Sequence, residues 1–237
     1  MGDGQWKIGF ARASILETAR ADGISLARIV VFTGPTLHPS EARDLEGSII
    51  LPPIKRGDLD IAKIYDPEII AIIDGEFYQS LAVSPKEILP FLERGVRVYG
   101  AASMGALRAV ELEKFGMIGI GKVFRLFRLK LLECDDEVAL AYCPRTYKAY
   151  SEPLVNTRYT LRLAIRNCIV TRAESARVLE ILKSTYFPER TRQFLLSAAS
   201  ATLGSKRARA FEDFLAAHPV NAKAEDAKSL MLELSRL

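Results

Sequence analysis

A serine lies between small residues at a point where the sequence predicts that a strand turns into a helix. Ser103 occupies the middle of the run Ala101-Ala102-Ser103-Met104-Gly105, which follows the apolar segment 96–99. Small neighbours allow a sharp turn, and the hydroxyl then projects above the sheet as in a nucleophile elbow. Backbone amides at the start of the helix could hold an oxyanion there. The alternative is that Ser103 only caps the helix and Gly105 only permits close packing.

A catalytic serine needs a base, and the sequence offers few of them near Ser103. Of the two histidines in the chain, only His38 lies in the same half as the serine. The other, His218, lies at a predicted helix end, so no Ser-Asp-His chain order follows Ser103. The remaining candidates for a base, or for a group that positions a water molecule, are Asp74, Lys86 and Glu87. A small serine-type hydrolase is therefore one hypothesis among several.

A glycine follows each of four predicted strands, together with hydroxyl or charged side chains. The short apolar runs 29–32, 49–51, 69–73 and 96–99 predict strands that are buried on both faces. Ligands of open parallel sheets bind at the carboxyl edge, so we expect a substrate or anion site there. Its candidate residues are Gly34, Arg56, Asp58, Gly75, Gly105 and Arg108. Arg108 suits a carboxylate or phosphate near Ser103, and its alternative is a surface pair with Glu111.

The order of predicted elements gives the fold class. Strands and helices alternate over residues 29–113, which predicts an α/β fold with a small Rossmann-like parallel sheet flanked by helices. Helical spacing dominates residues 150–237, so an all-α region is predicted to follow. We divide the chain into an N-terminal extension (1–28), an α/β domain (29–149) and a helical C-terminal region (150–237).

The composition excludes several classes of protein. The chain has 237 residues, of which 49% are hydrophobic and 26% charged, as in ordinary globular proteins. Three cysteines without a Cys-x-x-Cys spacing, together with only two histidines, argue against a disulfide framework and against a metal site. No apolar run is long enough to span a bilayer, and charged residues interrupt the N-terminal segment. A cytoplasmic protein is expected.

Positive charge is concentrated in the C-terminal third. Residues 1–144 carry 17 Lys and Arg against 20 Asp and Glu, a net of −3, whereas residues 145–237 carry 16 against 9, a net of +7. Arg158, Arg162 and Arg166 recur at four-residue spacing, which stacks them on one helix face. The basic region could face an acidic protein or a nucleic acid, or it could be a solvated helical surface. Because like charges repel at this spacing, we expect the three arginines to bind a partner.

Several motifs together resemble the TfuA-like family. The most specific stretch is Tyr99-Gly100-Ala101-Ala102-Ser103-Met104-Gly105-Ala106-Leu107-Arg108-Ala109. Shorter matches are Gly34-Pro35-Thr36, Arg56-Gly57-Asp58, Ile73-Asp74-Gly75, Lys86-Glu87-Ile88-Leu89, Asp135-Asp136-Glu137 and Ser151-Glu152-Pro153. The resemblance covers about residues 29–170. One departure is Pro85, where the family pattern has a histidine, so a histidine base is not expected at that position.

This resemblance implies a sulfur-delivery partner of a YcaO enzyme. YcaO enzymes phosphorylate a backbone amide oxygen with ATP, and in thioamidation a sulfide-level nucleophile then displaces the phosphate. The family implies a protein that binds YcaO, recruits a ThiS-like ubiquitin-fold carrier and hydrolyses its C-terminal thiocarboxylate to release sulfide. The implied final substrates, reached through YcaO, are peptides in RiPP biosynthesis or methyl-coenzyme M reductase.

The same resemblance sets the expectations for cofactors and partners. This chain is expected to bind no cofactor, while ATP and Mg²⁺ act on YcaO. Its partners are expected to be proteins, rather than a membrane or a nucleic acid. The alternative within the family is a non-catalytic adaptor or allosteric activator of YcaO, with all the chemistry on the enzyme.

Overall fold

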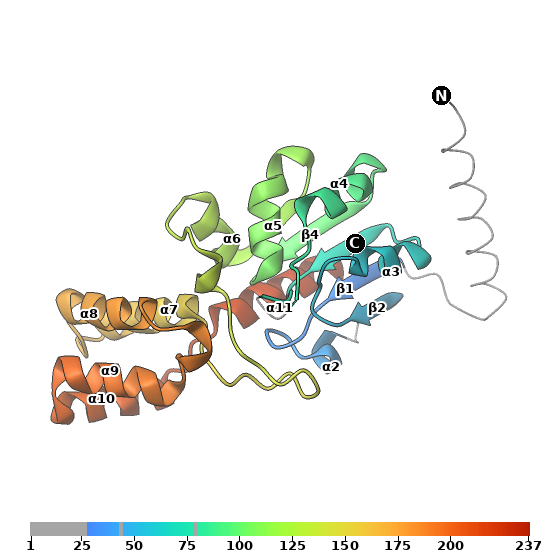
Figure 1. Cartoon of the computed structure of the whole chain (residues 1–237). Coiled ribbons are helices and arrows are strands. Elements are labelled where there is room, and N and C mark those ends of the chain that lie inside the picture. Colours follow the sequence, from blue (N-terminus) through green and yellow to red (C-terminus); the bar gives the residue numbers. More distant parts are fainter. Residues whose placement is uncertain (1–27, 43–44, 78–79) are drawn as a thin grey trace, which may run out of the picture.

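The structure is a computed structural model that describes residues 28–42, 45–77 and 80–237. The predicted N-terminal extension lies outside the described residues, apart from Arg28. Figure 1 shows a twisted sheet with helices on both faces and a group of helices at one end. The strands in the described part are β1 (Ile29–Phe32), β2 (Ser48–Leu51), β3 (Ile69–Ile72), β4 (Arg97–Ala101) and β5 (Ile118–Ile120).

The sheet is parallel throughout, with the order β2-β1-β3-β4-β5. The chain runs outward from β1 to β2, returns to β3 on the other side of β1, and continues outward to β5. The direction therefore reverses between β1 and β3, which is where doubly wound folds bind their ligands. The predicted α/β class is confirmed. The short edge strand β5, with Gly119 at its centre, was not predicted because its apolar run is too brief.

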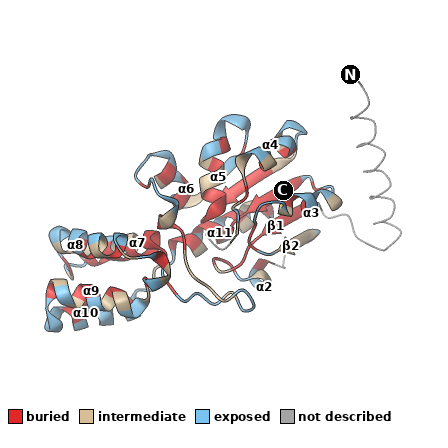
Figure 2. Ribbon diagram, in the orientation of Figure 1, coloured by how far each residue is buried: buried red, intermediate tan, exposed pale blue. Residues whose placement is uncertain are grey.

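Alternate residues of the strands face two separate cores. Val30, Ile70 and Val98 face one side, which is covered by α3 (Asp58–Ile64), α4 (Pro85–Glu93), α5 (Met104–Leu112) and α6 (Gly121–Arg128). Val31 and Ala71 face the other side, which is covered by α2 (Pro39–Ala42) and α11 (Ala222–Leu234). Strands that alternate between two buried faces have to be apolar at every position, which explains their continuous runs. Figure 2 shows this burial in red along the central strands. The edge strand β2 is only partly buried and is tan, although its apolar run predicted burial on both faces, because an edge strand has a neighbour on one side only.

Helix α4 begins as the sequence predicts. The Ser84 hydroxyl accepts a hydrogen bond from the Lys86 amide, and the Glu87 carboxylate accepts one from the Ser84 amide. Pro85 occupies the first turn, where a missing N–H costs nothing. This reciprocal capping satisfies two amides that the helix itself cannot pair.

A helical lobe extends from the sheet domain. It consists of α7 (Leu154–Arg166), α8 (Arg172–Lys183), α9 (Arg192–Leu203) and α10 (Ser205–Ala217), packed around a core of their own. The predicted all-α character of the C-terminal region is confirmed, but its last helix is not part of the lobe. Figure 1 shows α11, in red, returning along the sheet. Ala227, Leu230 and Leu234 form its apolar stripe, and this stripe packs on the second face of the sheet.

Within the described residues, no helix combines the length and the apolar character that crossing a membrane requires.

Candidate functional site

The chain makes an unusually tight turn immediately before Ser103. The Ser103 amide donates a hydrogen bond to the Ala101 carbonyl at 2.7 Å, and Ala102 between them has a φ of 63°. A three-residue turn with positive φ at an alanine is strained by about 1 kcal/mol or more. Ser103 occupies the N-cap position of α5, yet its side chain makes no capping hydrogen bond. The Ser103 hydroxyl therefore does not cap the helix, contrary to the capping interpretation, and it can interact with a ligand.

Glycines set how deeply this turn lies in the sheet. A Cβ added to Gly105 would lie 1.7 Å from the Ile72 carbonyl oxygen, and one added to Gly100 would lie 2.1 Å from the Gly105 oxygen. No side chain fits at such distances, so the backbone of α5 rests directly on β3 and β4. This contact holds Ser103 close to the sheet, where only 2% of the residue is exposed.

Asp74 connects the two strands at which the chain direction reverses. It follows β3, and its carboxylate accepts hydrogen bonds from the amides of Gly34 and Thr36, both at 2.9 Å. The Thr36 hydroxyl donates a third hydrogen bond to it at 2.5 Å. Three donors stabilise a carboxylate that is otherwise buried. Asp74 thereby fixes the loop after β1 against the end of β3.

A buried lysine reaches this edge from the far end of the sequence. Lys223 lies in the first turn of α11 and is only 2% exposed. Its ammonium group donates a hydrogen bond to the Val138 carbonyl at 2.7 Å. Burial lowers the pKa of Lys223 to about 8, although the carboxylates of Asp74 and Glu152 act in the opposite direction. A lysine with this pKa is partly neutral near physiological pH, as a general base has to be.

Ser103, Asp74 and Lys223 line one narrow cavity at the carboxyl edge. Its volume is about 20 Å³, which is room for about one water molecule. Its other walls come from Pro35, Gly75, Glu76, Phe77, Val138, Leu140, Tyr142 and Phe187. Because the cavity is so small, polar groups that line it lie close to whatever occupies it. The arrangement brings a hydroxyl, a carboxylate and an amine of lowered pKa around one water-sized space.

The cavity has a largely apolar wall, which strengthens electrostatic effects inside it. Tyr142 belongs to a short hairpin closed by an antiparallel bridge between Tyr142 and Ala149. Burial, together with the carboxylates of Glu76 and Asp74, raises the pKa of the Tyr142 hydroxyl, so this hydroxyl stays protonated. Its ring stacks on Tyr147, with ring centroids 6.2 Å apart.

Of the predicted site residues, Ser103, Asp74 and Gly75 line the cavity, and Gly34 and Gly105 shape its surroundings.

The other predicted site residues do not line the cavity. Lys86 is exposed at the start of α4, and Glu87 is used in the capping of that helix and in a hydrogen bond from the Gly57 amide at 2.7 Å. Arg56 is exposed, and Asp58 accepts a hydrogen bond from the Lys55 amide at 3.0 Å. His38 is also exposed and contacts Ser40.

Arg108 is nearly buried but does not line the cavity. It forms the ion pair with Glu111 that was the alternative interpretation, and its side chain is 14% exposed. Its Nε is buried and makes no hydrogen bond with the described residues.

The predicted arginine stripe on α7 is divided into two parts. Arg158 makes a two-bond ion pair with the buried carboxylate of Glu137, at 2.8 and 2.6 Å. Arg162 and Arg166 instead line an open groove of about 300 Å³, with Lys122 and Tyr159 on its other walls. The stripe therefore offers two exposed guanidinium groups for a partner, rather than three.

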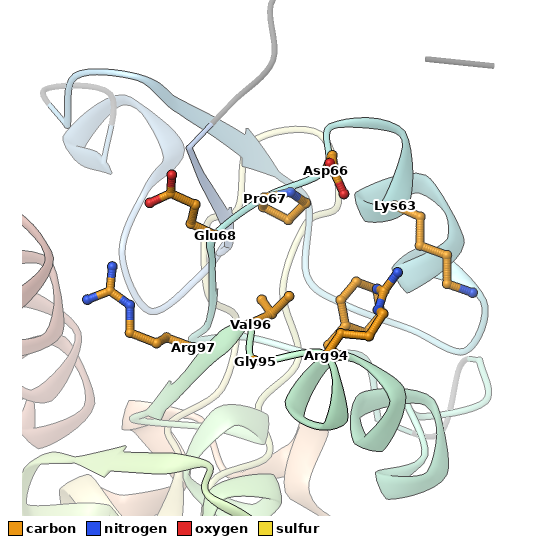
Figure 3. Close-up of a pocket in the computed structure, with 9 residues that line it drawn as sticks. Lys63, Asp66, Pro67, Glu68, Arg94, Gly95, Val96 and Arg97 are labelled. Carbon is orange, nitrogen blue, oxygen red and sulfur yellow. The ribbon is translucent and has the colours of Figure 1, made fainter. Parts of the chain in front are cut away.

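The largest cavity among those described lies at the amino edge of the sheet, far from Ser103. It measures about 600 Å³ and lies between the segments that lead into β3 and β4. Figure 3 shows its charged lining of Lys63, Asp66, Glu68, Arg94 and Arg97. Part of this charge is already paired, as between Glu68 and Arg28 at 3.1 Å. The lining includes no serine, cysteine or histidine, so we place the candidate site at the carboxyl edge.

The fold and site define a doubly wound α/β protein with a buried serine and lysine at the carboxyl edge of its sheet. A family model described as TfuA-like protein matches residues 74–191, about half of the chain. The chain belongs to the TfuA-like family, as its motifs predicted. Proteins of this family are known as associates of YcaO enzymes. None of the curated proteins matches the chain.

The matched segment includes Ser103 and Asp74 but ends before Lys223. Sequence reasoning missed this lysine, although a signal was present. Lys223 is in helical register with Ala227, Leu230 and Leu234, so a charged residue stands on the apolar stripe of the last helix. A lysine is almost never fully buried without a specific reason, and this pattern marks it as a candidate functional residue.

Proposed function

We propose that this protein releases sulfide for a YcaO enzyme by hydrolysing the C-terminal thiocarboxylate of a ThiS-like carrier. The family supports a YcaO partner in general, and the thioamidated product would be a peptide or methyl-coenzyme M reductase. The observation that carries the hydrolytic part is the cavity shared by Ser103, Lys223 and Asp74. Hydrolysis of an acyl donor needs a nucleophile, a base and a place for the oxyanion, and these residues supply the first two.

In the first step, the neutral amine of Lys223 takes the proton of the Ser103 hydroxyl as its oxygen attacks the thiocarboxylate carbon. The Ser103 and Gly105 amides already donate to the Ala101 and Ile73 carbonyls, so the Met104 amide at the start of α5 is the one that stabilises the tetrahedral oxyanion. The carbon–sulfur bond breaks, Lys223 returns the proton to sulfur, and hydrosulfide leaves. The products are an ester on Ser103 and HS⁻, so atoms and charge balance.

In the second step, a water molecule hydrolyses this ester. Lys223 takes a proton from the water as its oxygen attacks the ester carbon. When the carbon–oxygen bond of the ester breaks, that proton passes to Ser103. The carrier leaves as a carboxylic acid, which releases the second proton of the water to solvent and becomes an ordinary carboxylate. Asp74 is a positioning residue, because its oxygens are already engaged by Gly34 and Thr36. Its negative charge favours the lysine ammonium that forms transiently in each step.

The size of the cavity limits what can enter it. A space for about one water molecule admits a single terminal atom of a thiocarboxylate, its oxygen or its sulfur, but no bulky side chain. A carrier with an extended, unbranched C-terminal tail meets this requirement.

The exposed groove on α7 suits the body of an acidic protein. Arg162 and Arg166 lie there with Lys122, in a C-terminal third that carries a net charge of +7. Complementary charge raises the rate of association more than it raises affinity. We assign this groove to a protein partner, the carrier or YcaO, while ATP and Mg²⁺ act on YcaO.

The test is a sulfide assay without YcaO. The protein is incubated with a thiocarboxylated ThiS-like carrier, and free sulfide is measured against the spontaneous rate. Ser103→Ala is the informative variant, and Ser175→Ala is the matched control because Ser175 is a buried serine in the lobe, away from the cavity. Catalysed release that Ser103→Ala abolishes supports the proposal. If sulfide is released only at the spontaneous rate, while the protein stimulates YcaO in a separate assay, the adaptor function is established instead.

A further inference from the structure

A second cavity lies between the lobe and the start of α11. It measures about 270 Å³, close to the small end of the range for ligand pockets. Leu195, Leu215, Pro219 and Val220 give it an apolar side, and its polar lining comes from Glu152, Asn156, Thr157, Thr160, Arg192, His218 and Asn221. An apolar surface with a few converging polar groups is typical of small-molecule sites.

Three helices direct their N-terminal ends toward this pocket. Asn156 and Thr157 belong to the first turn of α7, Arg192 opens α9, and Asn221 is the N-cap of α11. Each helix N-terminus carries a partial positive charge, although caps already bind some of the amides there, as Thr191 binds the Phe194 amide and Asn221 the Ala224 amide. Three such ends around one space favour an anion.

One side chain in the pocket has an unused hydrogen-bonding group. Thr157 is only 5% exposed, and its hydroxyl makes no hydrogen bond with the described residues. The neighbouring Thr160 differs, because its hydroxyl donates to the Asn156 carbonyl at 3.0 Å. Among the described residues, Arg108 Nε is the one fully buried side-chain atom without a hydrogen-bond partner, so the unpaired Thr157 hydroxyl keeps some accessible surface. Because Thr157 lines this pocket, its hydroxyl can donate a hydrogen bond to a polar group there.

The charges around the pocket are unequal. The Arg192 guanidinium is exposed at the rim and forms no ion pair with a described carboxylate, while Glu152 at the same rim attracts it from farther away. The C-terminal end of α10 also lies here, but His218 covers it, with Nδ1 at 3.2 Å from the Phe214 carbonyl oxygen. One guanidinium and three helix N-termini therefore outweigh one carboxylate and one covered helix C-terminus.

We propose that this pocket binds a small organic anion. Its phosphate or carboxylate group lies between the Arg192 guanidinium and the Thr157 hydroxyl, and a short apolar part lies on Leu195, Leu215 and Val220. Such a ligand would also hold the start of α11. Asn156 donates a hydrogen bond to the Asn221 side chain at 3.1 Å and accepts one from the Lys223 amide at 3.4 Å.

The experiment is calorimetric titration of the full chain with inorganic phosphate, phenyl phosphate and benzoate. We expect saturable binding of one equivalent of phenyl phosphate or benzoate, and the better of the two identifies the head group. Arg192→Gln is expected to weaken binding about tenfold or more, and Thr157→Val about threefold to tenfold, because each removes a hydrogen bond to an anion.

Two matched variants control for charge and for a lost hydroxyl. Arg177→Gln removes an exposed arginine from α8, away from the pocket, and Thr202→Val removes a hydroxyl that already donates to the Ala198 carbonyl at 2.8 Å. Both are expected to leave binding unchanged. Hydrogen exchange is expected to slow on binding at residues 152–160 and 218–224. The proposal is overturned if no probe binds saturably up to about 10 mM. It is also overturned if the Arg192 and Thr157 variants bind the probe as tightly as the wild type does.

Discussion

The two edges of the sheet differ in how they hold their charged groups. The amino edge has the larger cavity, about 600 Å³, and exposed charged side chains such as Lys63 and Glu68, which pairs with Arg28. The carboxyl edge has a cavity of only about 20 Å³, yet Ser103, Asp74 and Lys223 are all buried around it. Water screens the charges at the amino edge, whereas the apolar wall at the carboxyl edge leaves them strong. We therefore assign the proposed reaction to the edge with the buried groups, rather than to the edge with the larger cavity.

The largest expected effect comes from removing the hydroxyl at the carboxyl edge. Ser103→Ala should reduce sulfide release from the thiocarboxylated carrier about 10³-fold or more, because it deletes the nucleophile. The thermal unfolding temperature should stay close to that of the wild type, since the hydroxyl makes no capping hydrogen bond. If Ser103→Ala retains activity within a few-fold of wild type, Ser103 is not the nucleophile and only helps to bind the substrate.

Lys223 should govern how the rate depends on pH. With a pKa of about 8, its neutral fraction rises about tenfold per pH unit below pH 7 and levels off above pH 8, and wild-type sulfide release should follow it. Lys223→Met should lose about 10²-fold or more and show no such rise. A variant with the wild-type pH profile would exclude Lys223 as the base.

Lys223→Met should lower activity but raise the stability of the folded protein at neutral pH. The pKa of Lys223 is lower in the folded state, so the unfolded chain binds more protons between about pH 8 and 10.5. Wild-type stability should therefore rise with pH across this window through Lys223, and Lys223→Met should lack that contribution. At pH 7, removing the buried amine should raise the unfolding temperature, which calorimetry can measure.

A smaller effect is expected at the groove on α7. Reversing Arg162 and Arg166 to Glu should slow association with the carrier or YcaO about tenfold at low salt and flatten its salt dependence. Arg172 and Arg177, exposed on α8, provide a matched reversal of the same charge elsewhere on the lobe. Stopped-flow measurements at two salt concentrations compare the pairs. Equal effects of both reversals would show that only the net charge of the lobe matters. If neither reversal has an effect, the partner binds to another surface.

The smallest effect is expected at the amino edge. Arg97→Gln should leave sulfide release within about twofold of wild type, because Arg97 lies at the opposite end of the strands from Ser103. A large loss in a variant that remains folded would show that the wider cavity takes part in the reaction and would undo the contrast between the two edges.

Local patterns in the sequence determined the fold class. The apolar runs at residues 29–32 and 69–73 predicted strands buried on both faces, and Ser84 with Glu87 predicted the start of α4. These features depend on residues that are close in the sequence, so they can be recognised without tertiary structure. The edge strand β5 could not, because three residues give too short a pattern and its pairing with β4 depends on distant residues.

The site could be predicted only in part. Small residues around Ser103 indicated the turn, and the position of Asp74 after a predicted strand placed it at the same edge. Lys86, Glu87 and Arg108 were assigned to that edge from sequence spacing. Helix capping occupies the Glu87 side chain and an ion pair occupies Arg108, while Lys86 is exposed at the start of α4. Spacing fixes where a Cα lies along an element, but it does not fix which partner a flexible side chain meets.

The sequence by itself determined a parallel α/β sheet, a helical C-terminal region and a serine at a sharp turn between strand and helix. Only the tertiary structure decided which group meets that serine. Lys223 is 120 positions away in the sequence, and it reaches the cavity because α11 leaves the lobe and packs its apolar stripe on the second face of the sheet. The burial of that stripe is a long-range hydrophobic contact, and it carries the lysine into a buried site where its pKa falls.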